Sequence, residues 1–250
     1  MSVLRRPPEG LVGTLASRWE ALLAQLGAIA DAYPDAQLAS SMGVEDTLLI
    51  HALMQLPCRL EVFLLDTGRL HAETLDLVAV VEQRYGIRIR VMHPDPQAVK
   101  DHVDAYGEYA FHESVALRKA CCGIRKVEPL RRALAGHSAW ITGQRREQAV
   151  TRTELPESQW DAAFGLQKFN PLARWTTAEV WGVVHALGVP YHPLHDRGYP
   201  SIGCECCTRA VRAGEDLRAG RWWWEQRATR ECGLHAAPTV IPRAVPPSIP

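Results

Sequence analysis

The chain has 250 residues, of which 47% are hydrophobic and 22% are charged, and its formal net charge is zero. This length allows one large α/β domain or two small ones, and the charge balance argues against a nucleic-acid-binding protein that relies on bulk positive charge. No apolar run approaches the ~20 residues that a membrane helix requires, so we expect no membrane or nucleic-acid partner, no signal peptide and a cytoplasmic location.

Helices and strands are predicted to alternate along the chain. Apolar residues at helical spacing predict helices over residues 11–33, 47–56, 71–85, from 97 onward, 114–135 and 176–187. Short apolar runs predict strands over residues 37–39, 60–65, 87–92, 139–142 and 167–169. This alternation predicts an α/β fold with a mostly parallel central sheet and helices on both faces.

Three polar loops follow predicted strands, at residues 40–46, 66–69 and 143–148. In an open parallel sheet, ligands bind beyond the carboxyl ends of the strands. The first loop enters a helix whose amides could hold an anion, and the third carries guanidinium groups suited to phosphate. One such loop alone is more simply a capped polar connection, but three in register favour a site for a nucleotide-like anion. The candidate binding residues are Ser40, Ser41, Gly43, Asp46, Asp66, Thr67, Gly68, Gly143, Arg145 and Arg146.

Six of the seven cysteines are grouped, at residues 121–122, 204–207 and 232, which in a reducing compartment indicates metal binding or catalysis rather than disulfides. Cys204 and Cys207 are three residues apart and can share a metal on one face of a helical turn. The adjacent Cys121 and Cys122 diverge by roughly 100° on a helix, so they can bind one centre only if it is large. A [4Fe-4S] cube meets this condition better than a zinc ion, which normally takes two spaced pairs.

Two other cysteines are not expected to bind that centre. Cys206 lies between the spaced pair and should face away from the metal that they share. The isolated Cys58 is best explained as a small buried hydrophobic residue.

Cys232 stands apart from the other groups, with Arg218 and Arg221 before it and His235 after it. Neighbouring cations lower the pKa of a thiol, and the thiolate is the nucleophile. This pattern predicts a catalytic cysteine. The alternative is an arginine-rich solvated surface with an incidental cysteine.

The grouped motifs are CCGIRK at 121–126, GCECCT at 203–208, ECGLH at 231–235, SSMGVED at 40–46, LDTGR at 65–69, TGQRR at 142–146 and FNPL at 169–172. Together, over roughly residues 37–235 and in the same order, they resemble the assimilatory adenylyl-sulfate (APS) reductases. The chain departs from that pattern at Cys206, where related sequences commonly have a proline. This departure leaves open which thiols bind a metal.

The resemblance implies a fold like that of the adenine nucleotide α-hydrolases and a reduction of APS to sulfite and AMP. Cys232 would attack the sulfur, expel AMP and become an S-sulfocysteine, which an external dithiol, thioredoxin or glutaredoxin, would then reduce. By motif position, the implied ligands of one [4Fe-4S] cluster are Cys121, Cys122, Cys204 and Cys207. The implied catalytic residues are Cys232, His235, Lys126, Arg218 and Arg221, with Arg152 near the adenosine.

Three segments are expected along the chain. Residues 1–213 should form the α/β domain that binds the nucleotide and the cluster. Residues 214–236 should form a mobile catalytic segment, because Cys232 must meet first the substrate and then a protein partner. Residues 237–250, which contain five prolines, are expected to be a disordered tail.

Other functions stay open from the sequence alone. The nearest is a 3′-phosphoadenylyl-sulfate (PAPS) reductase, or an enzyme that uses both substrates, although enzymes of that type usually lack the cluster cysteines. A redox sensor with an iron-sulfur cluster would not need Cys232 or His235. A zinc-stabilised binding protein is a further alternative. The sequence does not decide between a monomer and a homo-oligomer.

Overall fold

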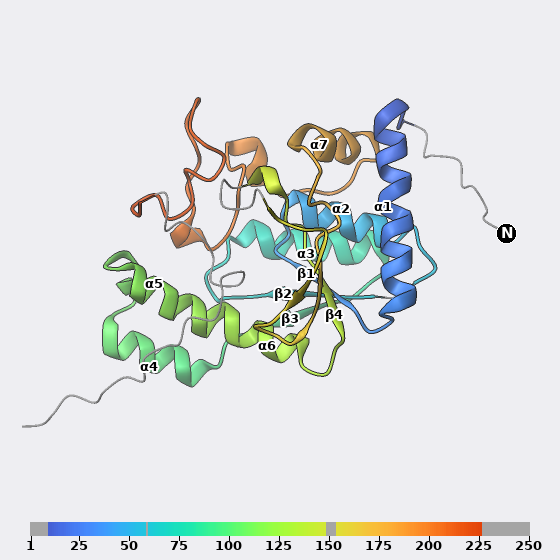
Figure 1. Cartoon of the computed structure of the whole chain (residues 1–250). Helices are drawn as coiled ribbons and strands as arrows, with labels where there is room; N and C mark the ends of the chain where they lie inside the picture. Colours follow the sequence, from blue (N-terminus) through green and yellow to red (C-terminus); the bar gives the residue numbers. More distant parts are fainter. Residues whose placement is uncertain (1–9, 59, 149–153, 227–250) are drawn as a thin grey trace, which may run out of the picture.

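A six-stranded sheet crosses the part of the chain that the computed structural model describes, residues 10–58, 60–148 and 154–226 (Figure 1). Its strands are β1 (Gln37–Ser40), β2 (Glu61–Leu65), β3 (Ile89–Met92), β4 (Ala139–Ile141), β5 (Ser158–Asp161) and β6 (Leu166–Phe169). They lie in the order β3-β2-β1-β4-β6-β5, and every neighbouring pair is parallel except β5 with β6. The predicted α/β fold with a mostly parallel sheet is therefore confirmed.

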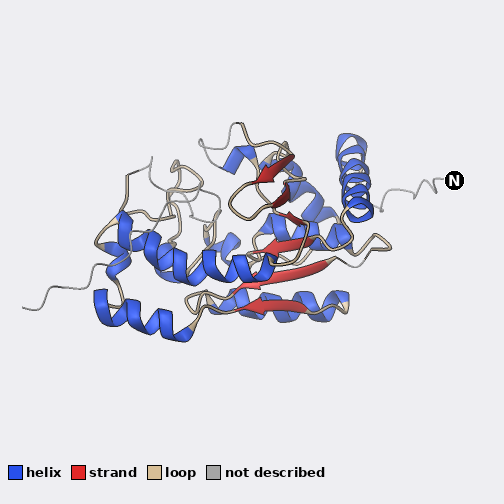
Figure 2. Cartoon of the chain, turned by 60° about the horizontal axis from the view of Figure 1, so that its bottom comes forward, coloured by secondary structure: helices blue, strands red, loops and turns tan. Residues whose placement is uncertain are grey.

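Helices cover both faces of this sheet (Figure 2). The α-helices are α1 (Gly13–Ala32), α2 (Val44–Leu53), α3 (Ala72–Tyr85), α4 (Pro96–Tyr106), α5 (Val115–Cys122), α6 (Glu128–Leu134) and α7 (Thr177–Ala186). Helix α2 contacts β1 and packs with α1 and α7, whereas α6 contacts β2 and β3. Within the described ranges, no helix combines the length and the apolar character that crossing a membrane requires.

Alternating side chains of the strands fill two separate cores. In β2, Val62 and Leu64 belong to the larger core with α1, α2, α3 and α7. Phe63, between them, belongs to a second core with Leu130 of α6 and Trp140 of β4. This division follows because successive residues of a strand point to opposite faces of the sheet. Both faces are apolar, as a mostly parallel sheet between two helical layers requires.

Three details of the secondary structure differ from the prediction. Helix α2 begins at Val44, three residues early, and thereby places two acidic residues in its first turn, where they suit the positive end of a helix. The edge strand β5 was not predicted, because three of its four residues are polar and all four are exposed or half-buried. The predicted helix over 114–135 is divided into α5 and α6 by a π-helical turn, Gly123–Val127. Such turns are frequent at functional sites.

The strand order reverses between β1 and β4. From β1 the chain adds β2 and β3 on one side, and from β4 the sheet continues through β6 to β5 on the other. In open α/β sheets, the crevice at the carboxyl ends of two such strands is the usual place for a ligand. The loops that follow β1 and β4 meet there.

Candidate functional site

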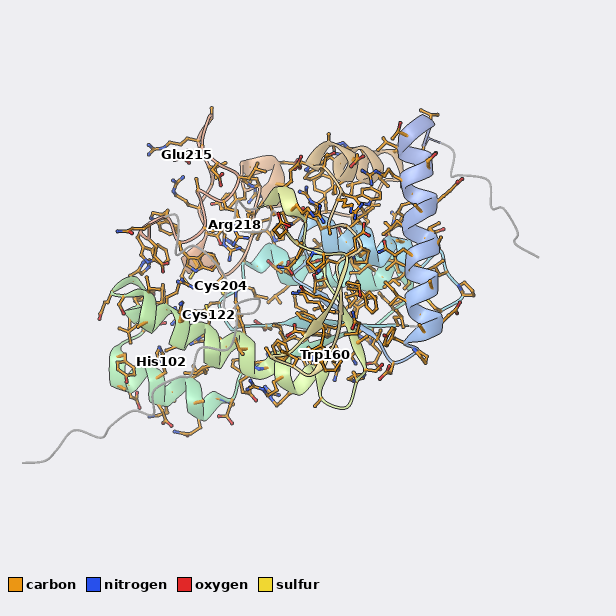
Figure 3. The ribbon with its side chains drawn as sticks, viewed as in Figure 1. His102, Cys122, Trp160, Cys204, Glu215 and Arg218 are labelled. Atoms are coloured by element: carbon orange, nitrogen blue, oxygen red, sulfur yellow. The ribbon has the colours of Figure 1, made fainter. Side chains whose placement is uncertain are left out.

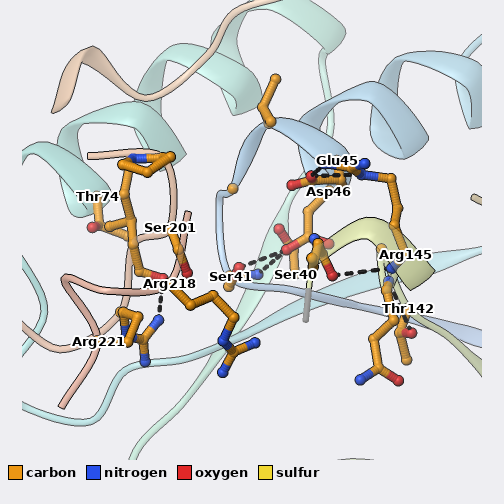
Figure 4. A pocket seen from close by; sticks show the side chains of 18 of the residues that line it. Ser40, Ser41, Glu45, Asp46, Thr74, Thr142, Arg145, Ser201, Arg218 and Arg221 are labelled. Atoms are coloured by element: carbon orange, nitrogen blue, oxygen red, sulfur yellow. Dashed lines mark hydrogen bonds and ion pairs between the residues drawn. The ribbon is translucent and has the colours of Figure 1, made fainter. Parts of the chain in front are cut away.

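A cavity of about 600 Å³ lies at this switch point, within the size range of pockets that bind small ligands (Figure 4). The loops after β1 and β4, the π-helical turn and parts of residues 195–221 line it. The predicted site residues that line it are Ser40, Ser41, Gly43, Asp46, Thr67, Lys126, Gly143, Arg145, Arg218 and Arg221. The structure therefore brings most of the predicted binding and catalytic residues to one cavity.

Three of the described residues that were predicted to bind the ligand, Asp66, Gly68 and Arg146, do not line the cavity. The Oδ1 atom of Asp66 accepts a hydrogen bond from the backbone N–H of Gly68 at 2.8 Å, which closes the turn after β2. Arg146 donates from Nε to the carbonyl oxygen of Leu155 at 2.9 Å. The local turn and this carbonyl, rather than a ligand, account for how these polar groups are oriented.

The carboxylate of Asp46 organises the loop after β1. It accepts hydrogen bonds from the backbone N–H of Ser41 at 2.6 Å and from the Ser41 hydroxyl at 2.7 Å. A side chain at Gly143 would overlap this carboxylate, so a glycine allows the loop after β4 to approach. Burial raises the pKa of Asp46 to about 6, against the lowering effect of the Ser41 hydrogen bonds. The amide of Ser41 is thus already satisfied within the protein.

Arg145 links the loop after β4 to the start of α2. Its side chain is 4% exposed, and its Nε and Nη2 atoms lie 2.9 and 2.8 Å from Oε1 of Glu45. It also donates to the carbonyl oxygen of Trp175 at 3.1 Å and pairs with Glu147 at 3.2 Å. Arg145 therefore holds the two loops together as an ion-paired strut, besides lining the cavity.

Positive charge gathers on the opposite side of the cavity. Figure 4 shows Arg218 and Arg221 together, away from the pair that Glu45 makes with Arg145. Lys126 also lines the cavity, from the π-helical turn. Three cations thus lie at one end of the cavity, and Glu45 and Asp46 lie away from them. This cationic end suits an anionic part of a ligand.

A second, smaller cavity carries the grouped cysteines. Its lining residues are Arg69, Phe111, Arg118, Cys121, Cys122, Arg125, Lys126, Cys204, Cys206, Cys207 and Trp222. Figure 3 shows Cys122, at the end of α5, near Cys204. Lys126 lines both cavities, so the cysteine cavity adjoins the cationic end of the larger one.

Backbone pairing places the second cysteine group beside the loop after β2. Cys204 forms an antiparallel bridge with Leu70, and the N–H of Glu205 donates to the carbonyl oxygen of Arg69 at 2.8 Å. The hydroxyl of Thr67 lies 3.2 Å from the Sγ atom of Cys204. Segments that are far apart in sequence thus meet at the thiols.

The groups around the smaller cavity fit an iron-sulfur cluster in their chemistry. Such clusters are held by cysteine thiolates, and the basic side chains in the same lining oppose the negative charge that the thiolates bring. Burial raises the pKa of Cys121 and so disfavours its thiolate. A bound metal would offset this effect, because it binds the deprotonated thiol. In the described ranges, no three His, Cys, Asp or Glu side chains are arranged around a single metal ion.

The expected orientation of Cys206 is wrong. Its side chain lines the cysteine cavity, and its Sγ atom lies 3.8 Å from that of Cys207. The reason is that Glu205–Cys207 is a short 3-10 turn, preceded by extended backbone at Cys204, rather than part of an α-helix. The hydrogen bond with Cys207 and the charge of Arg69 lower the pKa of Cys206.

The predictions for Cys232, His235 and Arg152 lie outside the described residues. The last described segment approaches the cysteine cavity, because Trp222 lines it and the backbone N–H of Trp222 donates to the carbonyl oxygen of Cys207 at 3.1 Å.

Two residues that were not predicted as site residues, Gln144 and His195, also line the larger cavity. Gln144 belongs to a loop that the strand pattern did identify. His195 lies in the short 3-10 helix Pro193–Arg197, whose sequence has no helical or strand periodicity that could have indicated it.

A family model described as the phosphoadenosine phosphosulfate reductase domain matches residues 35–210. The chain is similar to proteins named adenosine 5′-phosphosulfate reductase from several bacteria. It is 56% identical to that of Burkholderia cepacia, with 90% of this chain and 88% of the relative covered. It is 52% identical to that of Allochromatium vinosum (92% and 90% covered) and 47% identical to that of Neisseria meningitidis serogroup A (92% and 95% covered).

Solved structures share the fold at low sequence identity. A phosphoadenylyl-sulfate reductase of Candida auris superposes with a TM-score of 0.63 at 24% identity, covering 78% of this chain and 90% of that one. An FMN adenylyltransferase of Candida glabrata, solved with FMN and an ATP analogue, superposes with a TM-score of 0.56 at 14% identity, covering 94% and 82%. The same arrangement of strands and helices thus recurs in proteins of different names.

Proposed function

The chain belongs to the phosphoadenosine phosphosulfate reductase family, and we propose that it reduces adenylyl sulfate (APS) to sulfite and AMP in sulfate assimilation. It is accordingly an oxidoreductase that acts on a sulfur group. The names of the relatives that match some nine-tenths of the chain support APS as the substrate. The proposed electron donor is an external dithiol protein, thioredoxin or glutaredoxin, in the cytoplasm.

One observation carries this function: Lys126 lines both the nucleotide-sized cavity and the cysteine cavity. A substrate that joins a nucleotide to an oxidised sulfur group needs both features side by side. With Lys126, Arg218 and Arg221 at the shared end, the sulfate and phosphate groups of APS would lie there. The nucleoside would then extend toward the loops after β1 and β4.

In the first proposed half-reaction, the thiolate of Cys232 attacks the sulfur atom of APS. A sulfur–sulfur bond forms, the bond from sulfur to the bridging oxygen breaks, and AMP leaves with the electron pair. Negative charge grows on the departing phosphate, and Lys126, Arg218 and Arg221 would stabilise it. His235, three residues after Cys232, is proposed to assist at the same sulfonate.

In the second half-reaction, one thiolate of the donor attacks the Sγ atom of the S-sulfocysteine and releases sulfite. Its second thiol then reduces the mixed disulfide and restores the Cys232 thiol. The donor dithiol becomes a disulfide, and its two electrons reduce the sulfur from the sulfate to the sulfite oxidation state. Neither a flavin nor a nicotinamide is required for this balance.

Cys121, Cys122, Cys204 and Cys207 are proposed to hold one [4Fe-4S] cluster. When bound, the cluster would influence the charge of the neighbouring substrate site rather than carry electrons. Its ligands come from the end of α5 and from residues 204–207, so binding would also join these two segments.

The proposal is tested by anaerobic purification with iron and sulfide analysis, followed by intact mass after addition of APS alone. We expect iron and labile sulfide in equal amounts, and a protein whose mass has increased by one SO₃ group. Cys232→Ser should gain no mass and release no sulfite. Sulfite release by that variant would contradict the mechanism, and zinc without iron would contradict the cluster.

A further inference from the structure

Two buried hydrogen-bond acceptors of the larger cavity have no partner in the protein. Among the described residues that line it, Oε1 of Gln144 and Nε2 of His195 are both buried from solvent without a hydrogen bond. A buried acceptor that stays unsatisfied costs roughly 1–3 kcal/mol, so such atoms call for an explanation. A ligand bound in the cavity would explain them, because it could supply the missing hydrogen-bond donors.

The hydrogen bonds of His195 fix which of its ring nitrogens can accept. Nδ1 lies 2.8 Å from the carbonyl oxygen of Tyr199, and because a carbonyl only accepts, Nδ1 carries the proton. Burial lowers the pKa of His195, which keeps the ring neutral. Nε2 therefore presents a lone pair, and the ring edge is held against Trp181 of α7 with 5.2 Å between ring centroids.

Gln144 is also buried on the cavity wall. The residue is 6% exposed, and its backbone N–H donates to the hydroxyl of Thr142 at 3.3 Å. This contact orders the loop directly after β4, from which the side chain of Gln144 extends. Its neighbour Arg145 is tied to Glu45 on the same wall.

Both acceptors lie away from the cations of the cavity. Gln144 follows β4 beside the ion pair of Arg145, which Figure 4 shows opposite Arg218 and Arg221. His195 lies close enough to Glu45 for that carboxylate to act on its pKa, and Glu45 is the partner of Arg145 on the same side of the cavity. If sulfate and phosphate occupy the cationic end, as the proposed function requires, the nucleoside reaches the acceptors.

We propose that Gln144 Oε1 and His195 Nε2 accept hydrogen bonds from the nucleoside of the substrate and so select an adenine ribonucleotide. The fully ionised sulfate and phosphate groups of APS have no hydrogen to donate. Its donors are the exocyclic amine of adenine and the two ribose hydroxyls. Two buried neutral acceptors match two of these donors, and they disfavour nucleotides that place an oxygen lone pair at the same position.

The experiment measures calorimetric binding of AMP, of inosine monophosphate, in which a carbonyl replaces the amine, and of 2′-deoxy- and 3′-deoxy-AMP. Wild-type protein should bind AMP about 5-fold more tightly than each analogue that lacks a recognised donor, as expected for one neutral hydrogen bond. This series needs no variant, so a folding defect cannot obscure it.

Two variants then assign the donors. His195→Asn keeps a donor to Tyr199 and removes Nε2, while Gln144→Met keeps the shape of the chain and removes Oε1. Each should bind AMP about 5-fold more weakly and lose the discrimination against one analogue only. The same changes at exposed positions outside the cavity, His185→Asn and Gln97→Met, should bind every nucleotide as wild type does.

The inference is overturned if both cavity variants bind AMP with wild-type affinity, or if their discrimination is unchanged. Because it rests on the proposed function, sulfite release from APS by wild-type protein is measured in parallel. Absence of sulfite there would count against the proposed function itself. Sulfite release together with unchanged nucleotide selection would count against the two acceptors alone.

Discussion

The carboxylate of Asp46 accepts two hydrogen bonds from Ser41, from its backbone N–H and from its hydroxyl, yet burial raises the pKa of Asp46 to about 6. The folded pKa thus exceeds the value of 3.8 expected for an exposed aspartate. The folded state therefore binds a proton that the unfolded chain releases between about pH 4 and 6. The resulting stabilisation is present at low pH and is lost as the pH rises through 6.

The first prediction compares wild-type protein with Asp46→Asn, which cannot titrate. From pH 5 to pH 7, the free energy of unfolding of the wild type should fall by about 1 kcal/mol relative to the variant. Denaturant titrations at both pH values, with the difference between the two proteins taken at each, measure this change. A difference that stays constant, or that increases with pH, would show that the hydrogen bonds from Ser41 outweigh burial.

The second prediction concerns the close contact between Gly203 and Arg221. A side chain at residue 203 would overlap the guanidinium, which is 7% exposed and donates to the carbonyl oxygen of Ile202 at 2.9 Å. Gly203→Ala should therefore displace Arg221 and lower kcat/KM for APS about 10-fold, the size of one charged hydrogen bond. The measurement is sulfite release with a fixed dithiol donor.

A double variant shows whether Gly203→Ala lowers activity through Arg221 or by disturbing the structure in general. Gly203→Ala combined with Arg221→Ala should be no less active than Arg221→Ala alone, because both remove the same contact. Gly27→Ala, where an added Cβ meets nothing within 4 Å, should leave activity unchanged. Fully additive losses would refute the idea that Gly203 acts through Arg221.

The third prediction concerns a buried ion pair that holds the last described segment. Arg118 of α5 and Glu225 are 0% and 3% exposed, and Nη2 of Arg118 lies 3.0 Å from Oε2 of Glu225. Arg118→Met leaves a buried carboxylate without its main partner and should destabilise the protein by about 3–5 kcal/mol. Loss of the pair should also speed proteolysis near Glu225.

The matched control breaks an exposed pair. Lys100→Met removes the partner of Asp104 on α4 and should cost less than about 1 kcal/mol. Arg118→Met combined with Glu225→Gln should be more stable than Arg118→Met alone, since no buried charge is then left unpaired. Thermal unfolding of the four proteins measures both comparisons, and an Arg118→Met variant as stable as Lys100→Met would contradict them.

The sequence predicted the fold better than it predicted individual contacts. Residues 60–65 could be predicted as a strand because a strand that is buried on both faces is a continuous apolar run. Since the carboxyl ends of parallel strands lie at one edge of the sheet, the polar loops that follow the strands were expected to meet there. The sequence could not predict that Arg145 is occupied by Glu45, since ion pairing depends on distances across the sheet. His195 lacked any periodic pattern, and the contact of its Nδ1 with Tyr199, which leaves Nε2 as the hydrogen-bond acceptor, joins residues whose spacing in the fold the sequence does not give.

The last prediction decides which thiols hold the proposed cluster. Five cysteines line the smaller cavity, and Cys206 lies within 3.8 Å of Cys207, sulfur to sulfur, so spacing along the chain no longer separates them. Cys207 is buried and bridged through its carbonyl oxygen to Trp222, whereas Cys206 is half-buried, so Cys207 is the better-fixed ligand. Cys206→Ala, purified without oxygen, should keep the brown absorbance and the iron content of the wild type, and Cys207→Ala should lose both. If Cys206→Ala instead lost the brown absorbance and Cys207→Ala kept it, Cys206 rather than Cys207 would be the fourth ligand. Both outcomes are structurally possible, because the 3-10 turn at Glu205–Cys207 presents both thiols to the same cavity.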